Sequence, residues 1–122
     1  MANATPRFGT AASDDNTGRV LVNKVLEPAY AATLSIKPNA SKTHLKPATL
    51  TGAMTINCVE TFCAKYDELV VILTSDTTSR TVTFGTNFVT AGTISPAISK
   101  QATITFIYDG ANFVEICRAV QA

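Results

Sequence analysis

Two apolar runs flank an Asp-Gly pair in the stretch TFIYDGANFVEICRA, residues 105–119. Asp-Gly readily takes the positive φ angles of a tight turn, so the stretch predicts an antiparallel hairpin of fixed register. Side chains alternate between the two faces of a strand, which puts Phe106 and Tyr108 on one face and Thr105 and Ile107 on the other. The return run also carries apolar side chains on both faces. Each face of the hairpin therefore needs a cover, and a second copy of the chain could supply the outer one.

The composition of the whole chain favours strands. Of 122 residues, 46% are hydrophobic and 16% are charged, below the ~25% charged residues usual in soluble domains. The chain has 19 Thr and no Trp, and residues branched at Cβ pack well on a pleated sheet. The length suits one domain with a single core. We therefore expect an all-β fold, a small antiparallel β-sandwich or jelly-roll-like domain, with a largely neutral surface suited to protein contact.

The first 19 residues differ from the rest. Small and polar residues dominate them, and Phe8 is their only large side chain. They show no apolar periodicity that would support a core face. Residues 1–19 are therefore expected to form an extended N-terminal arm, and residues 20–122 the β-sandwich domain.

Alternating apolar residues and turn signals divide the domain into expected elements. Residues 39–48 are expected to form a loop. The overlapping segment 37–46 carries three Lys and no acidic residue, and it is expected to be solvated or to contact an anion or an acidic partner. Residues 59–68 are expected to form a connection with at most one helical turn, and residues 90–99 another loop. Strands are expected between these segments: one or two within 19–38, then 49–58, 68–76, 80–85, a short edge segment at 87–89, and the hairpin runs 101–110 and 111–120.

The charge pattern argues against nucleic acid and membrane as partners. The formal net charge is +1, and the basic residues are dispersed, so the basic footprint of a nucleic-acid-binding domain is missing. The longest apolar run, residues 69–73, is too short to span a bilayer. The chain opens without the apolar core of a signal peptide. We expect synthesis in the cytoplasm.

The cysteines do not follow a metal-site pattern. Cys58, Cys63 and Cys117 are odd in number, and the spacing of the first two does not match a zinc ribbon or a thioredoxin motif. The single His44 lies in the Lys-rich loop. We expect three free thiols that behave as small apolar residues, with one disulfide or thiol chemistry as the alternatives, and neither metal nor cofactor.

Residues for catalysis are also scattered. A nucleophile needs a base within hydrogen-bond reach, and His44 alone is a poor candidate. Asp76 and Asp109 look like turn residues, and the chain has no phosphate-binding Gly loop. We therefore expect that the protein is not an enzyme. Three aromatic residues could stack on sugar rings, although a core position is the simpler reading of each: Tyr66, Phe88 and Tyr108.

Four segments in order resemble a β-domain that recurs in bacteriophage structural proteins: LTGAMTIN (50–57), LVVILTSD (69–76), RTVTFGTNF (80–88) and FIYDGANFVEICR (106–118). Members of that group typically show an LTGxVTIN strand, a strand that ends in LTQD, a TVTWGxNF element and a terminal FxYDGTxWxE hairpin. The resemblance covers Thr49 to Arg118, a little over half of the chain. Phe84 and Phe113 stand where Trp is common in the group, which keeps an aromatic core residue but removes an indole N–H.

The resemblance implies a structural protein of the virion. In that group the domain occurs on tail fibres, tail-associated proteins and small head proteins, commonly as a trimer. The first hypothesis is a capsid decoration, or cement, protein on the capsid surface, a homotrimer that binds and stabilises the lattice of the major capsid protein. The alternative is a tail or head fibre component that binds a host receptor or surface glycan. The residues expected to contact a partner are Arg7, Phe8, Arg19, Tyr108 and Phe113.

Overall fold

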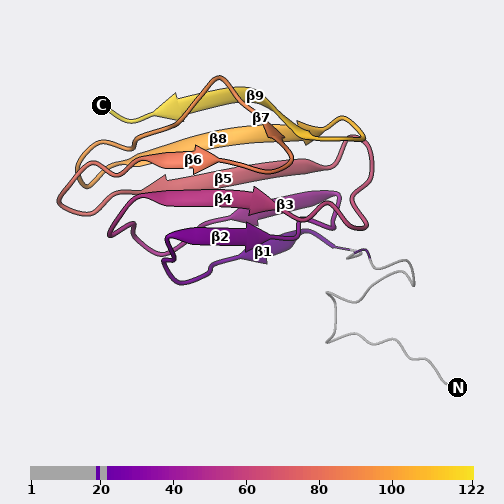
Figure 1. Cartoon of the computed structure of the whole chain (residues 1–122), viewed down its shortest axis with the longest axis horizontal. Coiled ribbons are helices and arrows are strands. Elements are labelled where there is room, and N and C mark those ends of the chain that lie inside the picture. The colour runs from indigo at the N-terminus through magenta and orange to yellow at the C-terminus, as the bar shows by residue number, and fades with distance from the viewer. Residues whose placement is uncertain (1–18, 20–21) are drawn as a thin grey trace, which may run out of the picture.

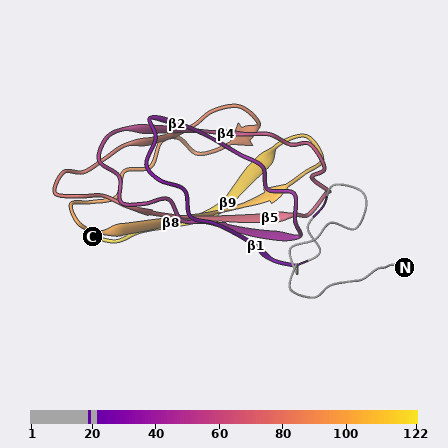
Figure 2. The ribbon, with the colours of Figure 1, turned by 90° about the horizontal axis from the view of Figure 1, so that it is seen from below.

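The computed structural model describes Arg19 and residues 22–122, and in this part of the chain it confirms the all-β fold (Figure 1). The strands pair into a six-stranded sheet of order β1-β3-β5-β8-β9-β7 and a three-stranded sheet of order β2-β4-β6. Figure 2 shows the two sheets as facing layers. The strands are β1 (Lys24–Leu26), β2 (Thr33–Ile36), β3 (Lys42–Leu45), β4 (Met54–Cys58), β5 (Glu68–Thr74), β6 (Val82–Phe84), β7 (Phe88–Val89), β8 (Gln101–Tyr108) and β9 (Phe113–Val120).

The first six strands wind as a coil. They alternate between the sheets in chain order, so β1, β3 and β5 lie in the larger sheet and β2, β4 and β6 in the smaller. Neighbouring strands within each of these sets pair in parallel. Parallel neighbours need a long crossover connection, and here each crossover contains a strand of the opposite sheet.

This coil corrects the expected antiparallel sandwich or jelly roll. Among the described strands, only β5–β8 and β8–β9 pair antiparallel, and β7 pairs with β9 in parallel. The alternation of apolar residues tells which side chains face the core. It does not tell whether a strand returns beside its predecessor or crosses to the other sheet, and in residues 24–84 the chain crosses each time.

The loop expected at residues 39–48 is also corrected, because β3 lies within it. Thr43 and Leu45 are fully buried, while Lys42 and His44 alternate with them toward the outer face. Three Lys within residues 37–46 suggested a solvated loop, although the segment contains a strand with one buried face. Residues 59–67 form a connection of turns, as expected.

The core fills the space between the sheets. Phe84 of β6 meets Phe106 of β8 at a ring-centroid distance of 5.0 Å, and Phe88 lies 5.1 Å from Phe84 and 5.0 Å from Phe106. Phe113 is fully buried beside Tyr108. Each buried aromatic side chain contributes about 1.5–3 kcal/mol through removal of apolar surface from water, so this aromatic cluster joins the smaller sheet to the hairpin.

The expected hairpin is present, with a four-residue loop. One carboxylate oxygen of Asp109 accepts hydrogen bonds from the backbone N–H groups of Ala111 (2.8 Å) and Asn112 (2.7 Å), and Gly110 takes a φ of +103°. A bulge between Thr105 and Phe106 shifts the register of β9.

The bulge changes which residues of β9 face the core. Cys117 pairs with Thr105 on the outer face, instead of sharing the face of Phe113. Glu115 and Arg118 pair with Phe106 and Ile104, respectively, and therefore lie on the core side of the sheet.

Candidate functional site

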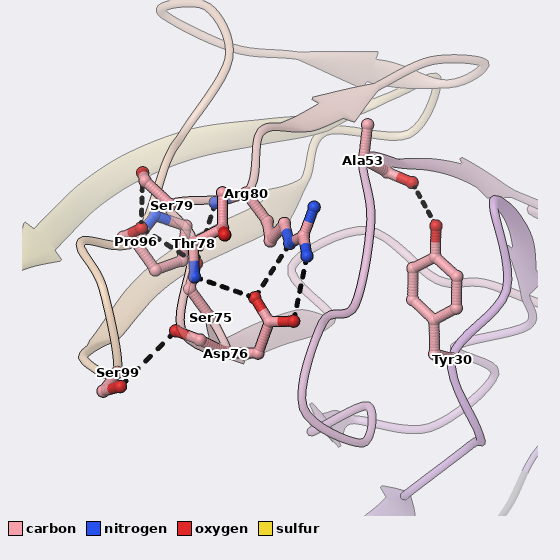
Figure 3. Close-up of polar contacts among 9 residues, drawn as sticks. All are labelled: Tyr30, Ala53, Ser75, Asp76, Thr78, Ser79, Arg80, Pro96 and Ser99. Carbon is pink, nitrogen blue, oxygen red and sulfur yellow. Dashed lines mark hydrogen bonds and ion pairs between the residues drawn. The ribbon is translucent and has the colours of Figure 1, made fainter.

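A polar cluster joins the β5–β6 connection to the segment before β8 (Figure 3). The Arg80 guanidinium donates to both carboxylate oxygens of Asp76, at 2.9 Å each. This ion pair lowers the pKa of Asp76 and raises that of Arg80. Thr78 N–H also donates to Asp76. The carboxylate is therefore held as an ionised turn residue, as its position in the sequence suggested.

The hydroxyl groups of this cluster are committed to the backbone. Ser75, which is buried, donates to the Pro96 carbonyl at 2.9 Å and accepts from Arg80 N–H. Ser79 donates to the same carbonyl at 2.8 Å. A serine nucleophile needs a base that accepts its proton, and both hydroxyl protons point to a carbonyl instead. The cluster fastens two loops to each other.

A second cluster, at the opposite end of the strands, holds Arg19. Its guanidinium donates to the two carboxylate oxygens of Asp67 at 2.7 and 2.9 Å and to the Phe62 carbonyl at 2.8 Å. Asp67 is only 4% exposed and also accepts from Ala64 N–H. Arg19 was expected to contact a partner; within the described chain its side chain ties Arg19 to the β4–β5 connection.

The other expected contact residues fall into two groups. Tyr108 and Phe113 are buried in the core, so their side chains are not displayed to a partner. Burial and a hydrogen bond to Glu60 (3.2 Å) raise the pKa of Tyr108 to about 12. Arg7 and Phe8 lie outside the described residues.

The β4–β5 connection displays two aromatic side chains. Phe62 and Tyr66 are exposed, Tyr66 by 73%, and both take left-handed backbone angles, with φ of 65° and 77°. The Lys37 ammonium lies 5.9 Å from the centroid of the Phe62 ring, and the Lys65 ammonium lies 5.5 Å from that of Tyr66. Bulky residues rarely adopt such φ values, and strain of this kind concentrates at binding sites. Of the three aromatic residues considered for sugar stacking, Tyr66 is the exposed one.

The three cysteines are free thiols in the structure. Cys58 is buried, Cys63 is half-buried and donates to the Pro38 carbonyl at 3.4 Å, and Cys117 is exposed. The hydrogen bond with Cys63, together with burial, raises the pKa of Cys58. Cys58 belongs to the hydrophobic core cluster and is therefore a packing residue. Within residues 22–122 and Arg19, no group of three or more His, Cys, Asp or Glu could hold a metal ion.

The last feature is the outer face of the six-stranded sheet, on which the strand pairing aligns uncharged side chains. Val70 and Ile72 of β5 lie there, and β8 and β9 continue the surface. Val25 and Ile116 at its margins are 63% and 56% exposed. The charges on it gather at β3 and β5, where Lys42 pairs with Glu68 at 3.3 Å. Figure 2 shows no further layer of described strands over this face. Its other members are His44, Thr103, Thr105, Ile107, Val114, Cys117 and Ala119.

This outer face matches the expectation that apolar groups line both sides of the hairpin. The Arg19–Asp67 pair has no comparable signal, because the two residues are 48 positions apart and belong to no motif. The aromatic pair in the β4–β5 connection could have been noticed only as two aromatic residues in a segment of mixed pattern.

Comparison with known proteins gives no family assignment: no family model matches the chain, and no curated protein matches it. The described residues also contain no helix long and apolar enough to cross a membrane.

Proposed function

We propose that the protein is a bacteriophage structural protein that decorates the capsid surface, where a homotrimer binds and stabilises the lattice of the major capsid protein. The observation that carries this proposal is the outer face of the six-stranded sheet. It is broad, largely uncharged and free of any covering element among the described residues. Contiguous exposed apolar surface of this kind marks protein–protein contact sites.

A sheet face can serve this role because burial of apolar area favours association by about 25 cal/mol per Å². A stable interface needs roughly 800 Å² from each partner. A protein that binds the assembled lattice and not its separate subunits shifts the equilibrium toward the shell by mass action. The four motifs that resemble virion β-domains support a place on the virion.

The polar clusters support a binding role over a catalytic one. Ser75 and Ser79 donate to a carbonyl, and Asp76 is held by Arg80. These contacts fasten loops, so we propose that the protein is not an enzyme.

The experiment is a binding assay with isolated heads that lack the protein. The wild-type chain is expected to sediment as a trimer and to saturate the heads at many copies per particle. Ile72→Glu places a charge at the centre of the outer face and is expected to give monomers that do not bind. Thr83→Glu, on the exposed face of β6, is the matched control and should behave as wild type. An Ile72→Glu protein that trimerises and binds as well as this control would contradict the proposal.

A second candidate function is that of a tail or head fibre component that binds a host receptor or surface glycan. The exposed Phe62 and Tyr66, each with a Lys ammonium over its ring, favour it. Aromatic faces stack on sugar rings. Only a handful of copies per virion, together with loss of host-cell binding in Tyr66→Ala, would favour this function over decoration.

A further inference from the structure

Two of the cysteines lie together at one end of the core. Cys58 is the last residue of β4, and its side chain faces the core and is only 3% exposed. Cys63 belongs to the β4–β5 connection, is half-buried and packs against the core cluster that contains Cys58. The two thiols form a hydrogen bond with each other. Cys63 therefore covers Cys58 at the place where the core meets the surface.

Backbone contacts on both sides hold this pair of cysteines in place. The Cys58 carbonyl accepts a hydrogen bond from the Asn87 side chain at 2.8 Å. The Cys63 N–H donates to the Glu60 carbonyl at 3.1 Å, and the Cys63 thiol donates to the Pro38 carbonyl at 3.4 Å. The short turn between the two cysteines thus keeps both sulfur atoms at the same end of the sandwich.

The two thiols differ in reactivity. The hydrogen bond with Cys58 lowers the pKa of Cys63 against the opposing effect of burial, and the Arg19 guanidinium lowers it further. The same hydrogen bond, together with burial, raises the pKa of Cys58. The thiolate is the attacking form of cysteine, so Cys63 is the nucleophile of the pair. A partly exposed thiolate beside a second thiol is the arrangement found in cysteines that respond to oxidants.

We propose that Cys58 and Cys63 are a redox pair, in which Cys63 attacks a low-molecular-weight disulfide such as oxidised glutathione and Cys58 completes a Cys58–Cys63 disulfide. In the first step, the Cys63 sulfur bonds to one sulfur of the small disulfide, whose S–S bond breaks, and one small thiolate leaves. In the second step, Cys58 gives its proton to solvent, its sulfur attacks the Cys63 sulfur, and the second small thiolate leaves. Two protein thiols are oxidised, and the small disulfide is reduced to two thiols, which take up the two protons.

The first step prepares the second. The largest influence that raises the pKa of Cys58 is its hydrogen bond with the Cys63 sulfur. Once that sulfur belongs to a mixed disulfide, it carries no charge and no longer retains the Cys58 proton. Cys58 then ionises more readily beside the sulfur that it attacks.

The third cysteine supplies a comparison within the same chain. Cys117 is exposed on the outer face of the six-stranded sheet, so this sheet separates it from the core that holds Cys58. A thiol without a neighbouring thiol stops at the mixed disulfide. Cys117 is therefore replaced in the test, so that only the redox pair is observed.

The test treats the full chain with Cys117→Ser with oxidised glutathione, stops the reaction with acid and measures the product by intact-protein and peptide mass spectrometry. The expected product is lighter by the mass of two hydrogen atoms, carries no glutathione and gives a peptide with an internal Cys58–Cys63 disulfide. A protein that stays unreacted, or that keeps glutathione on Cys63 while Cys58 remains a thiol, overturns the proposal. Because no capsid partner is used, the outcome is independent of the proposed function.

Two variants in the Cys117→Ser background separate the roles of the two thiols. Cys58→Ser is expected to stop at a glutathione adduct on Cys63. Cys63→Ser, shown to be folded by circular dichroism, is expected to acquire glutathione at least roughly tenfold more slowly than Cys58→Ser does. Equal rates of adduct formation in these two variants would contradict the assignment of Cys63 as the nucleophile. The existence of the redox pair is decided by the Cys117→Ser protein, in which both cysteines are intact.

Discussion

The two edges of the six-stranded sheet are finished in different ways. At the β7–β9 edge, Arg118 pairs with Glu115 at 2.6 Å and donates to the Thr93 and Gly92 carbonyls at 2.9 and 3.1 Å. Glu115 in turn accepts from Ala91 N–H at 2.9 Å. These contacts hold a loop over the inner side of β9. At the opposite edge, β1 and the neighbouring β2 of the smaller sheet have no such cover among the described residues, and Leu26 and Leu34 stay partly exposed.

The difference teaches where the domain is complete by itself. An exposed sheet edge invites pairing, and proteins limit this with short edge strands and covering loops. The β7–β9 edge uses both devices, because β7 has two residues and a clamped loop follows it. The β1 edge pairs with nothing beyond it in the described chain, so the described part of the domain leaves this edge open to a further strand.

The largest effect that separates the two edges should come from core truncations. Phe106→Ala, at a fully buried position of the aromatic cluster, is expected to lower the free energy of unfolding by about 3–5 kcal/mol. Leu34→Ala, at the open edge, should cost less than half as much because the side chain is already partly exposed. Denaturant unfolding of both variants measures this ratio. Equal losses would mean that the β1 edge is as well packed as the hairpin.

The next effect concerns the Arg19–Asp67 ion pair, which comes before β1 in the chain. Asp67→Asn leaves the Arg19 guanidinium without its carboxylate partner and is expected to cost about 2–3 kcal/mol, the size of a hydrogen-bonded charge pair with little exposure. Glu68→Gln is the control, because the Lys42–Glu68 pair is solvent-exposed and contributes at most about 1 kcal/mol. Chemical denaturation of the two variants should rank them in this order. The reverse order would show that the Arg19–Asp67 pair contributes less to stability than the exposed pair.

At the β7–β9 edge, the Glu115–Arg118 ion pair predicts that the free energy of unfolding depends on pH in the acid range. The Arg118 guanidinium lowers the pKa of Glu115 from its ordinary value of 4.5. The stabilisation from this pair is therefore full above pH 4.5 and is lost as the pH falls through the lower pKa of the folded state. Arg118→Met should make the acid limb of the stability curve shallower, as measured by urea unfolding between about pH 2 and pH 6. If Arg118→Met shows the same pH dependence of stability as the wild type, the Glu115–Arg118 pair does not stabilise the fold.

The smallest effect is expected in alkali. The folded chain raises the pKa of Tyr108 from 10.0 to about 12, so the protonated phenol is favoured by folding. Its contribution is complete below pH 10 and declines as the pH rises toward 12. Tyr108→Phe should flatten this part of the curve, with Tyr66→Phe as the exposed control. If the two variants lose stability identically in alkali, the phenol of Tyr108 is not the group responsible.

The fold could be predicted from the sequence where contacts are local. The hairpin strands are neighbours in the chain, and Asp109 and Gly110 mark their turn, so residues 101–120 are confirmed as a hairpin. The parallel pairing of β2 with β4 could not be predicted, because it depends on contacts between residues about 20 positions apart. The buried positions of Thr43 and Leu45 in β3 were also not predicted, because three Lys lie close to them in the sequence.

The candidate surfaces follow the same division. The apolar outer face was predicted, since strict alternation in residues 101–108 left side chains on both sides of β8. The burial of Tyr108 and Phe113 was not, because periodicity shows that two side chains share a face without showing which face the core covers. Arg19 was predicted to belong to a partner-binding arm. Its ion pair with Asp67 could not be predicted, because the two residues are 48 positions apart in the chain.

The winding of β1 to β6 has a consequence for how such a domain can change in length. Each circuit of the chain, such as residues 24–41, contributes one strand to each sheet and contacts mainly the neighbouring circuits. Duplication or loss of a whole circuit would therefore lengthen or shorten the molecule and leave the terminal hairpin as it is. Growth by complete circuits is open to this architecture, whereas an antiparallel sandwich of the same size would have to rebuild its core.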